Sequence, residues 1–90
     1  MTKKDFAKTI TAIRKDLHTV EFPKAMMTGQ QEAKRTCTVN CNGRHQGLTS
    51  ADMASTVLND PRFTAMLDRN NAHAVIEDNP EGFKQIRVRW

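Results

Sequence analysis

The strongest constraint on the fold is a series of start and stop signals between residues 49 and 90. Thr49-Ser50-Ala51-Asp52 predicts the start of a helix, because threonine is a favoured N-cap residue. Asp60-Pro61 predicts a second start, since Asp accepts from free backbone N–H groups and proline suits the first helical position. The run from Asp78 to Gly82 is typical of a hairpin turn. This segment therefore predicts two short helices and one β-hairpin.

Apolar residues in the same segment follow helical and strand periods. One face of each helix is apolar, formed by Met53, Ala54, Val57 and Leu58 in the first and by Phe63, Met66 and Leu67 in the second. Asn70-Asn71 predicts the end of the second helix. The hairpin strands are expected from Ala72 to about Glu77 and from Phe83 to Trp90. Alternation in the last strand predicts a buried face and a cationic face bearing Arg87 and Arg89.

The N-terminal half begins with an amphipathic helix. Its apolar stripe is formed by Phe6, Ile10, Ile13 and Leu17. Basic residues fall elsewhere on the same helix, at Lys3, Lys4, Lys8, Arg14 and Lys15. Two interpretations stay open for them: a solvated back of the helix, or a surface that contacts phosphates.

A long loop is expected over residues 19–34, with a helical turn near Ala25 to Met27, because Pro23 and Gly29 interrupt a polar run. The following strand, residues 36–42, alternates Cys37, Val39 and Cys41 with polar residues. On one face of a strand these cysteines lie roughly 13 Å apart, too far for a disulfide. They are interpreted as small buried apolar residues, with a metal site that includes His45 and His73 as the alternative.

The order helix-strand-helix-helix-strand-strand predicts one α+β domain over residues 1–90, with a small antiparallel sheet packed on helices. No apolar run approaches the length of a membrane span, and the N-terminus lacks the apolar block of a secretory signal, so a cytoplasmic protein is expected. The net charge is +4. Residues 1–48 carry nine Lys/Arg and four Asp/Glu, whereas residues 49–90 carry five and six. The basic character therefore lies in the N-terminal half.

The element order resembles that of winged helix-turn-helix domains. The resemblance is carried by Leu48 to Ala54 at the start of the helix pair and by the wing-like strands Val75 to Glu77 and Ile86 to Arg89. It implies a DNA-binding regulator whose helix from Pro61 to Asn70 enters the major groove. The residues expected to contact DNA are Arg62, Thr64, Asp68 and Arg69 on this helix and Lys84, Arg87 and Arg89 on the hairpin.

A protein-binding inhibitor or adaptor, of the kind that phages and mobile elements often encode, is the alternative. Here strand 36–42 pairs with the hairpin, and the partner protein contacts the sheet face and the 19–34 loop. That face gathers Thr36, Thr38, Asn40 and Asn42 with Arg87 and Arg89. The charge of −1 over residues 49–90 favours this alternative over phosphate binding. A free edge on strand 36–42 would also permit a homodimer.

Catalysis is not expected. The sequence has no Gly-rich phosphate loop, no usefully spaced carboxylate pair and no nucleophile tied to a base. His18, His45 and His73 are scattered, and no cofactor, catalytic residue or metal site is predicted. A small basic ribonuclease of the toxin type, using Arg87, Arg89 or His73, is the enzyme alternative.

Overall fold

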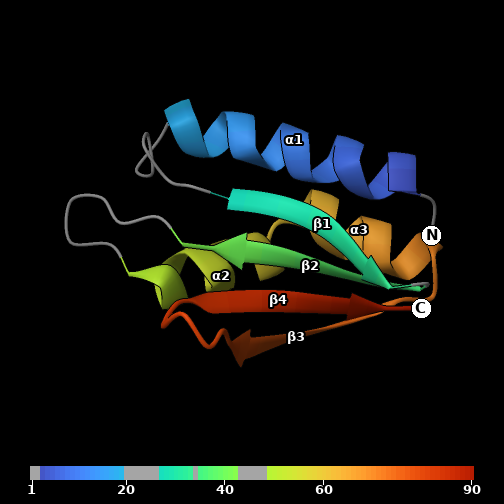
Figure 1. Ribbon diagram of the computed structural model, residues 1–90. Coiled ribbons are helices and arrows are strands. Elements are labelled where there is room, and N and C mark those ends of the chain that lie inside the picture. The colour runs from blue at the N-terminus through green and yellow to red at the C-terminus, as the bar shows by residue number, and fades with distance from the viewer. Residues whose placement is uncertain (1–2, 20–26, 34, 43–48) are drawn as a thin grey trace.

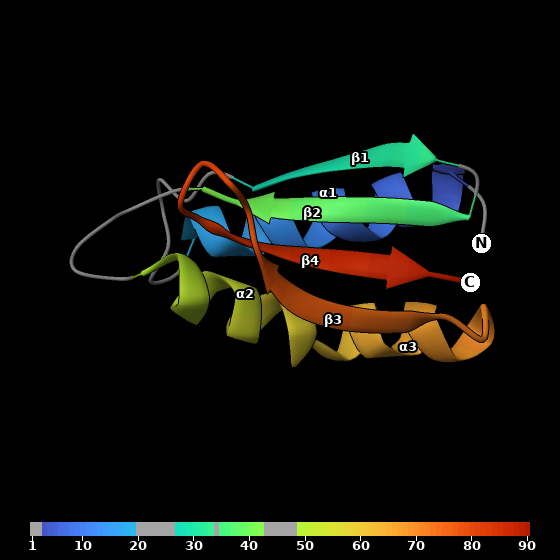
Figure 2. The same ribbon diagram turned by 60° about the horizontal axis from the view of Figure 1, so that its bottom comes forward.

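The computed structural model describes residues 3–19, 27–33, 35–42 and 49–90, with side chains for residues 4–16, 35–42 and 49–90. The elements are α1 (Lys3–Thr19), β1 (Met27–Ala33), β2 (Thr36–Cys41), α2 (Ser50–Leu58), α3 (Pro61–Arg69), β3 (His73–Asp78) and β4 (Lys84–Arg89). The strands form one antiparallel sheet in the order β1-β2-β4-β3. All three helices lie against one face of that sheet (Figures 1 and 2). The predicted α+β class with an antiparallel sheet is confirmed.

One core fills the space between the helices and the sheet. Its buried apolar residues are Phe6, Ile10, Ile13, Cys37, Val39, Cys41, Met53, Ala54, Val57, Phe63, Met66, Ile86 and Val88. The predicted apolar faces of the two short helices and of β4 are thus confirmed, as are those residues of the α1 stripe whose side chains are described. Burial of these residues, at about 25 cal/mol per Å² of apolar surface, is the main force holding the two layers together.

The helix boundaries follow the predicted local signals. Thr49 caps α2, with a capping box in which the Asp52 carboxylate accepts from the Thr49 backbone N–H at 2.9 Å. Asp60 caps α3 by accepting from the Arg62 backbone N–H at 2.8 Å, and Pro61 is the first helical residue. Asn59 separates the helices as the C-cap of α2. Two separately capped helices are therefore confirmed.

The structure corrects the prediction of a loop over residues 19–34. Residues 27–33 form β1, which pairs antiparallel with β2 in a register that sets Gly29 opposite Val39. The predicted helical turn is also wrong at Met27, which begins β1, while Ala25 and Met26 lie outside the described residues. Polar composition and Gly29 give this segment weak intrinsic strand preference, and pairing with β2 overrides it.

The same register changes the expected place of a free edge. β2 has β1 on one side and β4 on the other, so it is an inner strand and the prediction that it offers an edge for dimerisation is wrong. The edges of the sheet are β1 and β3. Pairing of β2 with the hairpin, which the second interpretation required, is confirmed: Thr36 lies opposite Arg89 and Asn40 opposite Gln85.

Candidate functional site

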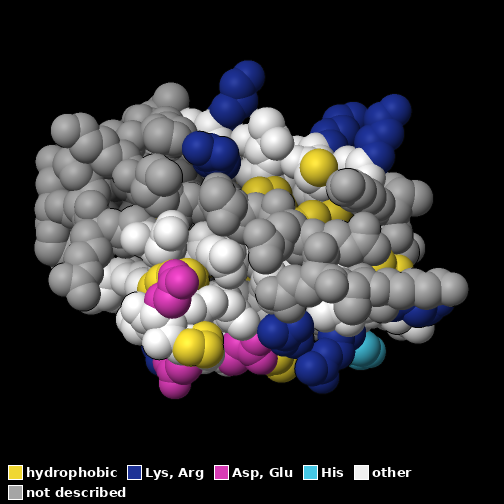
Figure 3. Space-filling model, viewed as in Figure 1, with side chains coloured by type: hydrophobic (Ala, Val, Ile, Leu, Met, Phe, Trp, Pro, Cys, Tyr) yellow, Lys and Arg dark blue, Asp and Glu magenta, His cyan; other side chains and the backbone are white. Residues whose placement is uncertain are grey.

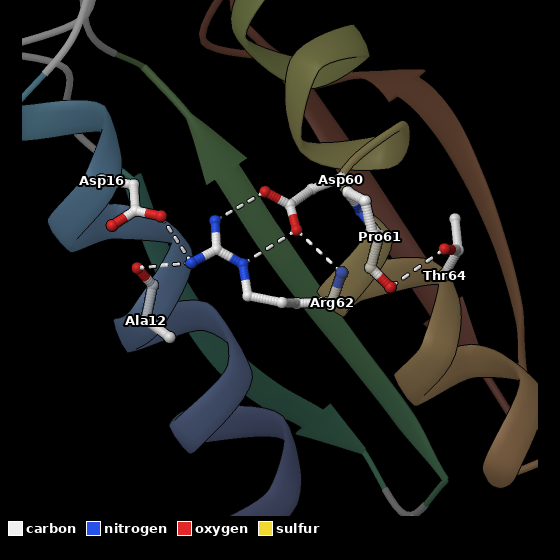
Figure 4. Close-up of polar contacts among 6 residues, drawn as sticks. All are labelled: Ala12, Asp16, Asp60, Pro61, Arg62 and Thr64. Carbon is white, nitrogen blue, oxygen red and sulfur yellow. Dashed lines mark hydrogen bonds and ion pairs between the residues drawn. The ribbon is translucent and has the colours of Figure 1, made fainter.

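The arginine at the start of α3 is held by carboxylates from two helices. Arg62 Nη1 donates to Asp16 Oδ2 of α1 at 2.6 Å. Its Nε and Nη2 donate to the two Asp60 oxygens at 3.0 and 2.7 Å (Figure 4). These hydrogen bonds lower the pKa of Asp60 and raise the pKa of Arg62. The guanidinium therefore fixes the start of α3 against α1.

The arginine at the other end of α3 repeats this arrangement. Arg69 donates to both oxygens of Asp5 in α1, at 2.5 and 3.2 Å. The Asn70 side-chain amide adds a bond to Asp5 at 2.9 Å. The bond from Arg69 is the largest cause of a lowered pKa at Asp5, followed by the bond from Asn70. Both arginines of the expected recognition helix thus contact α1.

What remains exposed on α3 is less cationic than the sequence indicates. Thr64 is exposed, but its hydroxyl donates to the Pro61 carbonyl at 3.1 Å. Asp68 adds an exposed negative charge on the same helix. A major-groove role for α3 stays a prediction, and the arginines that would carry it already have intramolecular partners.

Two of the three basic residues of the hairpin are also paired. Lys84 forms an ion pair with Asp78, directly opposite in the β3–β4 register. Arg87 Nε donates to Glu77 Oε1 at 2.7 Å. The pKa of Glu77 is lowered, chiefly by a hydrogen bond from Gln85 and then by Arg87. Arg89 is exposed and forms no ion pair with the side chains that the structure describes.

The second candidate surface is only partly accessible. Thr36 and Asn40 are half-buried and Asn42 is exposed, on strand β2 and just after it. Thr38 is fully buried, so its prediction as an outward contact is wrong. It lies on an inner strand in the middle of the sheet, opposite Gln30 of β1 and Arg87 of β4. The accessible residues of this surface therefore lie toward the two ends of β2, with the buried Thr38 between them.

The outer side of α1 is the clearest concentration of unpaired positive charge. Lys4, Lys8, Arg14 and Lys15 are all exposed, and none forms an ion pair within the described part of the chain. Lys4, Lys8 and Lys15 share a stripe, because spacings of four and seven residues return to the same side of a helix. Figure 3 shows Lys and Arg side chains projecting on the side of the molecule that α1 occupies in Figure 1.

The ion pairs between α1 and α3 engage the acidic residues of α1, so the exposed side of α1 carries a net positive charge. Asp5 and Asp16, on the side of α1 turned to α3, are paired with Arg69 and Arg62. The two described acidic residues of α1 are thus both engaged by arginines of α3. The helical spacing of the lysines predicts their stripe from the sequence. The pairing of both aspartates with α3 could not be predicted in this way, because it joins residues 46 and 64 positions apart.

The cysteines behave as the sequence predicts. Cys37 and Cys41 are free and buried, and burial raises the pKa of the Cys41 thiol to about 12. Among the residues described, no three His, Cys, Asp or Glu side chains are grouped to bind a metal. His45 lies outside those residues.

None of the described helices has the length and apolar character needed to cross a bilayer. No family model, curated protein or solved structure is similar enough to this chain to match it. The function is therefore inferred from the geometry and charge of the chain itself.

Proposed function

We propose that this chain is a non-enzymatic DNA-binding protein that contacts the phosphate backbone of duplex DNA through the outer side of α1. The observation that supports this proposal is the row of exposed basic residues Lys4, Lys8, Arg14 and Lys15, none of which forms an ion pair within the described part of the chain. From Lys4 to Lys15 the row extends about 16 Å along the helix axis. Duplex DNA presents about one phosphate per 1.7 Å of axis, so several phosphates lie within reach of such a row.

The proposal changes the expected contact surface, not the class of partner. The winged-helix resemblance assigned DNA contacts to Arg62, Arg69 and the hairpin. Contact through α1 instead uses basic residues that form no ion pair with the described side chains, so binding breaks none of the ion pairs that the structure describes. Phosphate contacts carry no base sequence information, and binding is expected to be largely independent of sequence.

Salt dependence is the sharpest test of this proposal. Four phosphate contacts give a slope of log K against log salt of roughly −3.6, or about a 150-fold loss of affinity between 50 and 200 mM salt. Fluorescence anisotropy with a mixed-sequence duplex measures both values. A single-stranded RNA of the same length run alongside shows whether duplex geometry matters.

A matched pair of double variants locates the contact surface. Lys8→Gln with Lys15→Gln should bring the slope to roughly −1.8, since two contacts are lost. Glutamine also keeps high helix propensity. The control, Lys84→Gln with Arg89→Gln, removes the same charge from β4 and should leave the slope unchanged. An equal loss in both variants would refute a site on α1, and no binding at 50 mM salt would refute DNA binding altogether.

A protein partner on the sheet face is the second candidate. The observation that favours it is the β2–β4 register, which assembles Thr36, Asn40 and Arg89 on the face that the described helices leave uncovered. This candidate predicts a chain that does not bind DNA and a partner complex that is lost on Arg89→Glu. Retention of that complex by the Arg89→Glu variant would refute it.

A further inference from the structure

Strand β3 is an edge strand, and no described strand pairs with its outer side. Its only neighbour in the described sheet is β4, and the paired residues run from His73 opposite Arg89 to Asp78 opposite Lys84. The hydrogen bond from Asn79 N to the Phe83 carbonyl, 2.8 Å, fixes the alternation of the ladder. Odd-numbered residues of β3 therefore direct their backbone groups to β4. Ala74, Ile76 and Asp78 direct their N–H and C=O groups outward.

The centre of this edge is also apolar on both faces. Val75 is 54% exposed and Ile76 is 38% exposed, and these are the exposed large apolar residues among the described side chains. Protein edges are commonly protected by Lys, Pro or a bulge. β3 has none of these, and its two acidic residues, Glu77 and Asp78, lie at its C-terminal end. Such an edge is suited to pairing with another strand.

We propose that β3 pairs antiparallel with β3 of a second copy of this chain, about a two-fold axis through Val75. In a continuous sheet, residues opposite each other share a face, so the axis must pass through a residue rather than between two. With the axis at Val75, each Val75 lies opposite the partner's Val75. His73 then lies opposite the partner's Glu77 and Ala74 opposite the partner's Ile76.

Side-chain chemistry favours this register over the one whose axis passes through Ile76. The Val75 axis joins apolar to apolar at the centre and sets an imidazole against a carboxylate on each side. An axis through Ile76 would set Val75 opposite the partner's Glu77 and Ala74 opposite the partner's Asp78. Two carboxylates of each copy then oppose apolar side chains, compared with one, Asp78 opposite the partner's Ala72, in the Val75 register. His73 is also left without an acidic partner. Cross-strand pairs of matched character are the ones that stabilise antiparallel sheets.

This inference goes beyond DNA binding and does not depend on it. The helix that carries the lysine stripe, α1, contacts β1 at the opposite edge of the sheet (Figure 1). A dimer through β3 joins the two sheets into one and keeps both α1 stripes accessible. Loss of dimerisation and loss of DNA binding are therefore separate outcomes, measured with different variants.

Cysteine cross-linking tests the pairing and the register together. In the proposed register Val75 forms a non-hydrogen-bonded pair with itself, with Cα atoms about 4.5 Å apart, within the range of a disulfide. Val75→Cys should therefore give a covalent dimer under mild oxidation. Ile76→Cys is the matched control, because it lies diagonal to its own copy at about 7–8 Å. The native cysteines are buried, and the unmodified chain should stay uncross-linked.

Sedimentation equilibrium gives a second measurement without a covalent bond. Val75→Lys should raise the dimer dissociation constant by about tenfold or more, since it sets two positive charges opposite each other at the axis. His73→Glu should weaken the dimer by facing the partner's Glu77, whereas His73→Lys should retain it. Circular dichroism checks that each variant is folded, as expected for exposed positions.

Each alternative result has a definite meaning. Faster cross-linking of Ile76→Cys than of Val75→Cys would overturn the register. If the chain stays monomeric up to several hundred micromolar and neither cysteine variant cross-links, the proposal that β3 pairs with a second copy is refuted. Equal dimerisation of the Val75→Lys variant and the unmodified chain would place the interface elsewhere.

Discussion

The N-cap of α3 offers a prediction that separates two roles of one side chain. Asp60 accepts from the Arg62 backbone N–H at 2.8 Å and also binds the Arg62 guanidinium. Replacing an Asp N-cap with Ala costs about 1 kcal/mol, within a range of roughly 0.5–2. The Arg62 side chain is 42% exposed, so its ion pair is screened and contributes about 0.2–1 kcal/mol. Asp60→Ala should therefore lower the free energy of unfolding by about 1–2.5 kcal/mol.

Asp60→Asn is the matched variant, because asparagine caps a helix as well as aspartate does but carries no charge. It should lose only the ion pair, about 0.2–1 kcal/mol. For a domain of this size, 1 kcal/mol corresponds to about 4–8 °C in Tm, so thermal and urea unfolding resolve the two variants. Equal losses in both variants would refute a capping role for Asp60. No loss in either would refute both contacts.

The pH dependence of the same pair tests the charge separately. Hydrogen bonding to Arg62 lowers the pKa of Asp60 in the folded chain. The ionised carboxylate therefore adds stability above its unfolded pKa of about 3.9, and this stability is lost as the pH falls through the folded value. The difference between the unmodified chain and Asp60→Asn should narrow on acidification from neutral pH. Carboxylates that contact neither Asp60 nor Arg62 contribute equally to both proteins and cancel in that difference.

Three further predictions address the hairpin turn, the core and the α1–α3 contact. Gly82 has φ +95°, and a Cβ built there meets no atom within 4 Å, so Gly82→Ala should cost about 1–2 kcal/mol through backbone strain alone; an unchanged urea midpoint would contradict this. The Cys41 thiol, with its pKa raised to about 12, should react with an aromatic disulfide reagent near pH 8 only on unfolding, and rapid labelling of the native chain would contradict this burial. Arg62→Glu should lower the unfolding midpoint, more at low salt than at high salt, because it sets a carboxylate against two others. Arg89→Glu is its control and should change the midpoint little, and equal effects would argue against the α1–α3 contact.

Local signals could be predicted from the sequence because they depend on neighbouring residues. The caps at Thr49 and Asp60, the proline at the first position of α3 and the turn ending at Gly82 each act within a few residues. The apolar stripe of α1 and the alternation in β2 are equally local. Each of these patterns has one dominant structural interpretation, and the structure agrees with it.

The rest depends on contacts between distant parts of the chain. β1 carries no strong strand pattern and exists as a strand because β2 pairs with it. That pairing makes β2 an inner strand and moves this edge of the sheet to β1. The ion pairs of Arg62 and Arg69 likewise join residues 46 and 64 positions apart. A sequence shows that an arginine is on a helix surface, but not which carboxylate another helix brings to it.

These distant contacts also decide how a DNA-binding experiment must be interpreted. Reversal of charge at Arg62 and Arg69 would appear to test α3 as a reader, yet both arginines hold α3 against α1. Loss of binding in that variant could follow from a displaced α1 as readily as from lost DNA contacts. The lysines of the α1 stripe have no such structural partner within the described residues, so their removal changes the surface charge alone. A change in salt slope on Lys8→Gln with Lys15→Gln, in a chain of unchanged stability, therefore reports contact with phosphates and not a change in the fold.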